Sequence, residues 1–96
     1  AESLGVALTL HPDDPPRPLF GLPRVVSTEG DYAALFEAVP SPANGMCFCT
    51  GSLGVRADNN LTGIARRFAP RSHFAHLRAT KRGADGLSFH EADHLD

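Results

Sequence analysis

Three side chains in this sequence have the chemistry of transition-metal ligands, and each follows a short apolar run. They are His11, Cys49 and His76. Imidazole nitrogen and thiolate sulfur are strong donors to divalent transition metals. If the apolar runs form parallel strands, their carboxyl ends share one edge of a sheet, where the ligands of α/β proteins bind. The sequence therefore predicts that these three residues converge on a single ion.

Each of these residues also has a plainer interpretation. His11 could simply begin a solvated turn before the proline-rich "PDDPPRP", and Cys49 could be a buried, inert thiol. Cys47 precedes Cys49 by two residues on the same predicted strand and is interpreted as a core residue. If "HFAHL" is a strand, His73 and His76 point to opposite faces, which gives His73 a structural role.

Arg78 and the last histidines add further polar chemistry. Arg78 shares a strand face with His76, where it could pair with a substrate carboxylate or form an ordinary surface ion pair. His90 begins "HEADH", which matches the zinc-protease pattern H-E-x-x-H. That pattern needs a helix, but here it follows a glycine-containing loop and has the charged Asp93 at its fourth position. A protease is therefore disfavoured. His90 and Glu91 are interpreted either as part of a loop that lines the same cavity as the three ligands or as ordinary solvated residues.

The segments around these residues alternate between apolar runs and helix-like spacing. Because strands that alternate with helices of this length form crossover units, the pattern predicts an α/β fold with a parallel sheet. We expect one partial domain over residues 1–96, with about three βα units. The expected elements are strands at 4–10, 45–50 and 73–77, helices at 31–39 (capped by Ser27 or Thr28) and 61–68, and loops at 11–18 and 51–60.

Composition excludes several classes of function. The formal net charge of -2 over 96 residues and the scattered basic side chains argue against binding to nucleic acid or an anionic membrane. No apolar run approaches a membrane span, and the first residues lack the pattern of a signal peptide. Two cysteines one residue apart suit free thiols or metal ligands in the cytosol. Because the chain starts without Met and stops directly after "HEADHLD", we expect it to be a piece of a longer protein.

Four long strings resemble the mannonate dehydratases, enzymes of hexuronate breakdown. They are "HPDDPPRPLFGLPRVVST", "CTGSLGVRADNNL", "RFAPRSHFAHLRATKR" and "SFHEADHLD". The resemblance implies a TIM (β/α)8 barrel, incomplete in this chain, and a divalent cation, Mn²⁺ or Fe²⁺ with Mg²⁺ or Co²⁺ as alternatives. It implies dehydration of D-mannonate to 2-dehydro-3-deoxy-D-gluconate. The family's metal ligands fall on His11, Cys49 and His76, with a fourth ligand expected beyond Asp96.

Several expectations accompany this resemblance. Arg78 and His90 are predicted to contact substrate, the proton-abstracting residue is not assigned, and the full-length enzyme is expected to form a homo-oligomer. Ala79 and Cys47 depart from the family pattern without touching a predicted ligand. Two alternatives stay open: a barrel fragment without catalysis of its own, and a related metal-dependent sugar isomerase.

Overall fold

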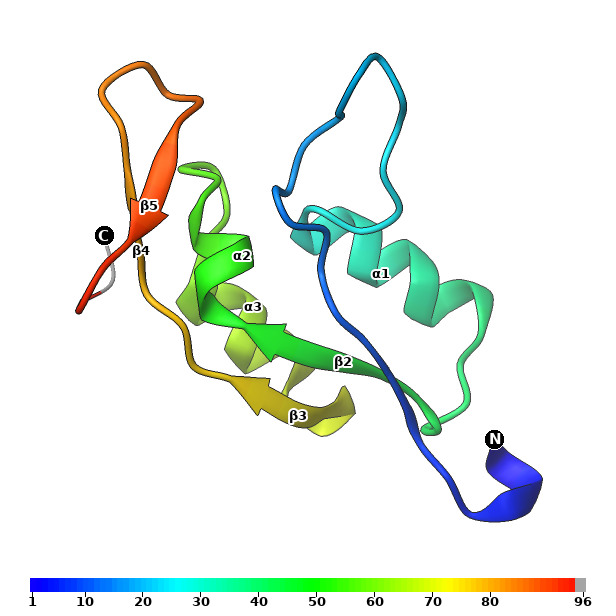
Figure 1. Ribbon diagram of the computed structural model, residues 1–96. Helices are drawn as coiled ribbons and strands as arrows, with labels where there is room; N and C mark the ends of the chain where they lie inside the picture. The colour runs from blue at the N-terminus through cyan, green and yellow to red at the C-terminus, as the bar shows by residue number, and fades with distance from the viewer. Residues whose placement is uncertain (95–96) are drawn as a thin grey trace.

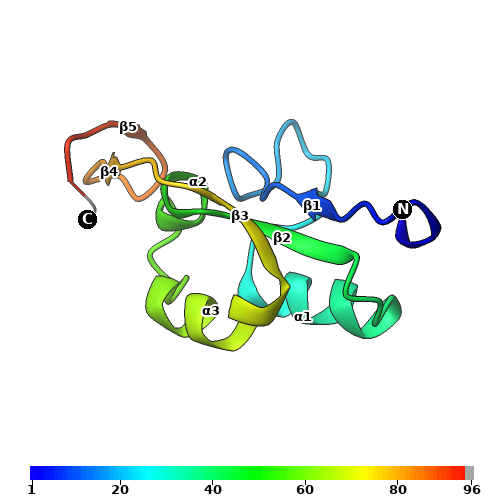
Figure 2. The same cartoon turned by 90° about the horizontal axis from the view of Figure 1, so that it is seen from below.

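The computed structural model describes residues 1–94 and builds them around a three-stranded parallel sheet with the spatial order β1, β2, β3 (Figures 1 and 2). A second, two-stranded antiparallel sheet pairs β4 with β5. The predicted α/β class with parallel strands is confirmed. The strands are β1 (Leu8–Leu10), β2 (Asn44–Cys49), β3 (Ser72–His76), β4 (Thr80–Arg82) and β5 (Phe89–Glu91).

Helices connect the parallel strands, and α1 and α3 lie on the same face of the sheet (Figure 2). One crossover runs from β1 through α1 to β2, and the other runs from β2 through α2, α3 and η2 to β3. Within residues 1–94, no helix has both the length and the apolar character needed to cross a membrane. The helices are η1 (Glu2–Leu4), α1 (Glu29–Ala38), α2 (Thr50–Gly54), α3 (Leu61–Phe68) and η2 (Ala69–Arg71).

The start of α1 is determined by a capping box. Thr28 Oγ1 accepts a hydrogen bond from the Asp31 backbone N–H, and the Asp31 carboxylate accepts from the Thr28 N–H at 3.0 Å. These bonds satisfy N–H groups that have no partner within the helix. Thr28, one of the two predicted caps, is therefore the N-cap, and the helix begins at Glu29, two residues earlier than predicted.

An aromatic cluster packs the helices against the sheet. The rings of Tyr32, Phe36 and Phe68 lie with centroids 5.3 to 6.2 Å apart, in tilted or edge-on arrangements. Met46 of β2 and Ile64 of α3 are fully buried in the same core. The buried Tyr32 hydroxyl donates a 2.9 Å hydrogen bond to the carbonyl oxygen of Leu10. This bond fixes the end of β1 directly before the first predicted metal ligand.

Three local predictions were wrong. The predicted loop at 51–60 begins with α2, because the Cys49 side chain caps a helical turn there. The first strand covers only Leu8–Leu10, since η1 and Gly5 (φ 66°) turn the chain before it. His90 lies in β5 rather than in a loop, because a tight turn stabilised by the Asp85 carboxylate pairs β5 with β4.

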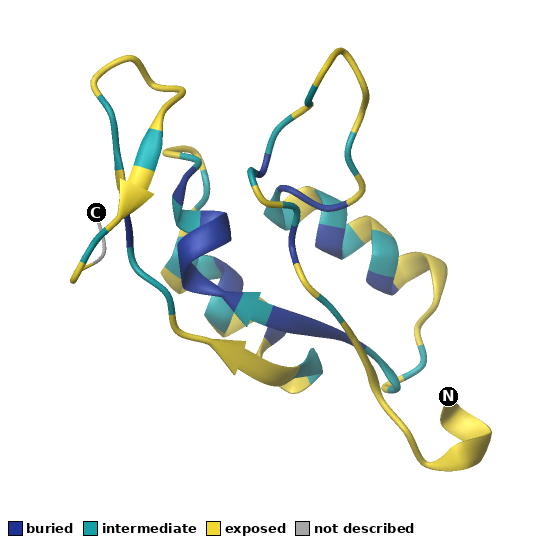
Figure 3. Ribbon diagram, in the orientation of Figure 1, coloured by how far each residue is buried: buried dark blue, intermediate teal, exposed yellow. Residues whose placement is uncertain are grey.

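Burial is uneven across the parallel sheet (Figure 3). β2 is largely buried, whereas β3 is exposed along most of its length. Apolar side chains remain exposed on both outer strands: Leu8 of β1 is 65% exposed and Phe74 of β3 is 60% exposed. The sheet therefore presents apolar surface at both of its edges.

Candidate metal centre

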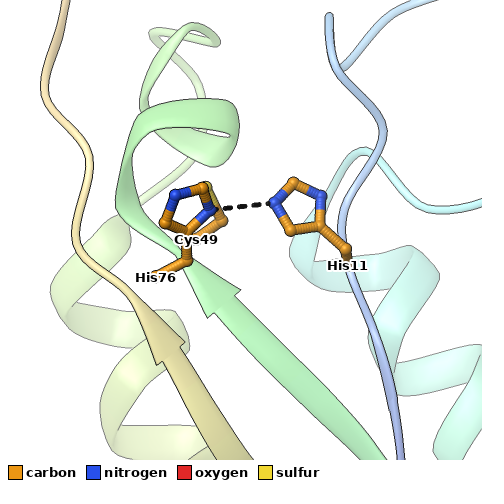
Figure 4. Close-up of side chains that lie close together, drawn as sticks. All are labelled: His11, Cys49 and His76. Atoms are coloured by element: carbon orange, nitrogen blue, oxygen red, sulfur yellow. Dashed lines mark hydrogen bonds between the residues drawn. The ribbon is translucent and has the colours of Figure 1, made fainter.

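The three predicted ligands lie side by side at the carboxyl edge of the parallel sheet (Figure 4). His11 directly follows β1, whereas Cys49 and His76 are the last residues of β2 and β3. The strand register places Cys49 and His76 opposite each other. Parallel pairing thus brings together three residues that are far apart in the sequence.

The distances between the ligand atoms suit a shared ion. His11 Nε2 lies 3.3 Å from His76 Nδ1, and Cys49 Sγ lies 3.5 Å from that same nitrogen. All three ligand atoms lie within 4.8 Å of one another. With metal–nitrogen bonds of about 2.05 Å and a metal–sulfur bond of about 2.3 Å, tetrahedral geometry separates neighbouring ligand atoms by roughly 3.4 to 3.6 Å. The separations of His76 Nδ1 from His11 and from Cys49 match these values, and the third separation is at most 4.8 Å, so the donor set can approach one divalent transition metal.

Hydrogen bonding determines which nitrogen His11 offers. Its Nδ1 lies 2.7 Å from the carbonyl oxygen of Pro12. Because a carbonyl oxygen can only accept, Nδ1 carries the proton and donates it, which leaves a lone pair on Nε2. Partners of this kind commonly fix the tautomer and orientation of a ligating histidine. His11 thus presents Nε2 to the cluster, while His76 presents Nδ1.

Cys49 is fully buried, and its sulfur has polar neighbours of its own. Sγ accepts a hydrogen bond from the Ser52 backbone N–H at 3.4 Å, and Ser52 Oγ lies 3.3 Å from it. Cys47 is also buried but lies outside the cluster, and its pKa is raised by burial and by the neighbouring Cys49. The two thiols therefore occupy different environments on one strand.

Arg78 lies beside this cluster in a network of two carboxylates. Its Nη1 donates to Asp14 at 2.7 Å, while Nε and Nη2 both donate to Glu91. Hydrogen bonds from Arg78 hold the pKa of Glu91 below its ordinary value, and those with Glu91 raise the pKa of Arg78. Only 19% of the Arg78 side chain is exposed. The guanidinium thus joins the loop after β1 to the β4–β5 hairpin.

The aliphatic part of Arg78 packs closely over α2. A Cβ placed on Gly51 would lie 2.5 Å from Arg78 Cγ, so only glycine leaves room for this side chain. Thr50 Oγ1 also donates to the Arg78 carbonyl oxygen at 2.6 Å. The first turn of α2 and the segment after β3 are therefore packed together next to Cys49.

The remaining histidines lie outside the cluster. His73 Nε2 contacts the carbonyl oxygen of Pro42 at 2.8 Å, and His90 Nδ1 contacts the carbonyl oxygen of Glu91 at 2.8 Å. Since Phe89–Glu91 form a strand, the "HEADH" segment lacks the helix that a zinc protease requires. Among residues 1–94, His11, Cys49 and His76 form the one group of three metal-ligating side chains with a shared focus.

Sequence reasoning missed three residues around the cluster: Ser52, Asp14 and Glu91 as the partner of Arg78. Ser52 could have been found from the sequence. A side chain that caps a helix accepts a hydrogen bond from the backbone N–H three residues later, and Ser52 follows Cys49 by three residues. Asp14 and Glu91 could not have been found in this way, since their pairing with Arg78 depends on how a loop and a hairpin fold over the sheet.

Known proteins resemble this chain along its whole length. A family model described as D-mannonate dehydratase (UxuA) matches residues 1–96. A mannonate dehydratase of Brucella canis is 75% identical over all 96 residues of this chain, and one of Chromohalobacter salexigens is 60% identical over the same length. The chain spans about a quarter of the length of these curated relatives, 24% and 25% respectively.

A solved structure shares the fold. The crystal structure of mannonate dehydratase from Streptococcus suis serotype 2 superposes with a TM-score of 0.88 at 34% sequence identity. The match covers 99% of this chain and 27% of the solved chain.

Proposed function

The chain belongs to the D-mannonate dehydratase family, and from this membership we propose that it supplies part of the active site of a hydro-lyase. The reaction would convert D-mannonate to 2-dehydro-3-deoxy-D-gluconate and water, a step of hexuronate catabolism. The observation that carries the proposal is the convergence of His11, Cys49 and His76 within 4.8 Å of one another at the end of a parallel sheet.

The proposed cofactor is Mn²⁺ or Fe²⁺, with Co²⁺ or Mg²⁺ as alternatives. Two imidazole nitrogens and one thiolate favour a transition metal over Mg²⁺, which prefers oxygen ligands. When bound, such an ion supplies Lewis acidity toward the carboxylate and hydroxyl oxygens of a sugar acid. His11 and His76 would hold it through Nε2 and Nδ1, and Cys49 through its sulfur.

Arg78 is the proposed partner of the substrate carboxylate. It lies two residues beyond His76, and a planar guanidinium binds a carboxylate through two parallel hydrogen bonds. Glu91, whose side chain is 67% exposed, occupies one edge of this guanidinium. Substrate would therefore replace Glu91 at Arg78, with one carboxylate exchanged for another. His90, next to Glu91 on β5, is the second proposed substrate contact.

The wider setting follows from the same membership. We propose that the βα units of this chain belong to a (β/α)8 barrel and that the enzyme is a homo-oligomer. The two free thiols suit the cytosol as its compartment.

Replacing Cys49 by Ser in the protein at its full natural length tests the metal centre. We expect less bound metal by atomic emission and a large loss of D-mannonate turnover, because a hydroxyl is a far weaker donor than a thiolate to such an ion. Cys47→Ser is the matched control, since it changes a buried thiol on the same strand outside the cluster. Unchanged metal content and activity in Cys49→Ser would defeat the assignment.

A further inference from the structure

We propose that Ser52 is a positioning residue for the sulfur of Cys49, and that its hydroxyl donates a hydrogen bond to the thiolate that binds the metal. The proposal rests on the metal centre proposed above. Ser52 does not itself coordinate the ion. By donating a hydrogen bond to one lone pair of the sulfur, it would orient another lone pair toward the ion.

The first support is the geometry around the sulfur. Ser52 contacts Cys49 Sγ twice, through its backbone N–H at 3.4 Å and through Oγ at 3.3 Å. Both residues are fully buried, with 0% exposure. A buried anionic sulfur without water around it needs hydrogen-bond donors from the protein. A protonated Cys49 thiol donates to Ser52 Oγ, but a thiolate can only accept, so with the anionic sulfur Ser52 would supply two donors, its hydroxyl and its backbone N–H.

The second support is the direction of the hydroxyl proton. The other hydrogen-bond partner of Ser52 Oγ among the described residues is Arg78, whose Nη1 lies 3.5 Å away. A guanidinium has donors only, so the serine oxygen must accept from it. The serine proton then remains for Cys49 Sγ. Arg78, itself held by Asp14 and Glu91, therefore favours the hydroxyl orientation that serves the thiolate.

The third support is the rigidity of the surroundings. Gly51 allows the Arg78 side chain to lie directly against the α2 backbone, because any larger residue would place a Cβ within 2.5 Å of it. Thr80 Oγ1 adds a 3.0 Å hydrogen bond to the Gly51 carbonyl oxygen. The turn that carries Ser52 is thus fixed from two sides. A hydroxyl on such a turn can position a sulfur ligand, whereas one on a mobile loop could not.

The test uses Co²⁺ as a spectroscopic probe in the protein at its full natural length. Ser52→Ala removes the hydroxyl but keeps the backbone N–H. We expect the dissociation constant for Co²⁺ to rise roughly tenfold to a hundredfold, the usual effect of losing a partner of a metal ligand. We also expect the sulfur-to-cobalt charge-transfer band to move to longer wavelength, because a sulfur with fewer hydrogen bonds gives up an electron more easily.

Ser72→Ala is the matched control. Ser72 donates its hydroxyl to the Phe68 carbonyl oxygen at the opposite end of β3, away from the cluster, so the control should leave both the Co²⁺ affinity and the band unchanged. If Ser52→Ala does not fold, the pair Ser52→Thr and Ser52→Val repeats the comparison at nearly constant volume. The valine variant should show the longer-wavelength band and the weaker binding.

Two results would overturn the proposal, and they differ in what else they affect. If Ser52→Ala, or the valine variant relative to the threonine variant, leaves the affinity and the band unchanged, then Ser52 does not position the sulfur, although Cys49 still ligates. If wild-type protein shows no sulfur-to-cobalt band, or Cys49→Ser leaves that band intact, the metal centre itself fails and the role of Ser52 fails with it.

Discussion

At the scale of single residues, Arg78 has the surroundings that bear most directly on the proposed substrate contact. Its guanidinium donates to Asp14, in the loop after β1, and to Glu91, in β5, and so links these two segments. A planar group with several donors can hold two carboxylates at once, which a single ammonium cannot do with the same geometry. The same property would let it exchange Glu91 for the carboxylate of a sugar acid.

Replacing Arg78 by Lys should therefore impair substrate binding. We expect KM for D-mannonate to rise roughly tenfold to a hundredfold, the worth of one or two charge-assisted hydrogen bonds. Steady-state kinetics on the protein at its full natural length would measure this. Arg56→Lys is the control, because Arg56 makes a similar two-point contact with Asp58 in a different part of the chain. An unchanged KM in Arg78→Lys would remove this residue from the substrate site.

The convergence of His11, Cys49 and His76 was predictable from the sequence because each stands at the end of an apolar run. That argument needs only the parallel direction of the strands, which alternating strands and helices impose. The roles of Asp14 and Glu91 were not predictable, since they depend on how the loop after β1 and the β4–β5 hairpin pack against Arg78. The sequence therefore identified the candidate ligands but not the carboxylates that hold Arg78 beside them.

At the scale of elements, local side-chain bonds decide where helices start. The Asp31 carboxylate accepts backbone hydrogen bonds from Ser27 and Thr28 at the start of α1. Partial burial is the largest single influence on this group and raises its pKa. The hydrogen bonds from Ser27 and Thr28, together with the positive charge of Arg56, outweigh burial, and the net effect is a lowered pKa. The charged form of Asp31 is thus the one that caps the helix.

Asp31→Ala should lower the free energy of unfolding by about 1 kcal/mol near neutral pH, as for other lost helix caps. Because the folded-state pKa is depressed, this contribution is fully present above the ordinary Asp pKa of 3.8 and is lost as pH falls through the lower folded value. The free energies of unfolding of wild type and variant, measured with urea, should therefore converge at acidic pH. Glu37→Ala, an exposed site on the same helix, is the control. If the difference in free energy of unfolding between wild type and Asp31→Ala persisted in acid, the capping role would be contradicted.

The elements that sequence reasoning placed well are those with a clear apolar period. The helix at Leu61–Phe68 was predicted with its observed bounds because Ile64 and Phe68 form its buried stripe. The short helix α2 was missed because its first turn depends on the capping sulfur of Cys49, not on any periodicity of its own. The β4–β5 hairpin was missed for a similar reason: its turn is held by one carboxylate, that of Asp85.

At the scale of the whole molecule, the parallel sheet is covered by helices on one face while its outer strands expose apolar side chains. Leu8 and Phe74 are each more than half exposed, and Leu77, directly after β3, is 81% exposed. Edge strands with apolar surface usually pair with other strands or are covered. We therefore expect the 96-residue polypeptide on its own to associate in solution and to lack D-mannonate turnover.

Sedimentation and a turnover assay on that polypeptide would check both expectations. A monodisperse monomer would show that the exposed strands need no covering. Measurable turnover would show that these residues suffice for catalysis and would favour an enzyme complete within them.

The short first strand has a consequence for thermal behaviour. β1 has three residues, pairs with β2 alone and is largely exposed, yet the residue that follows it is His11. An ion shared with Cys49 and His76 would tether this short strand to its neighbours, so binding energy would become folding energy. At an ion concentration one hundred times the dissociation constant, that linkage amounts to about 2.7 kcal/mol. A chelator should then lower the melting temperature. During heating, the backbone amides of β1 should lose their protection from hydrogen exchange before those of the aromatic core.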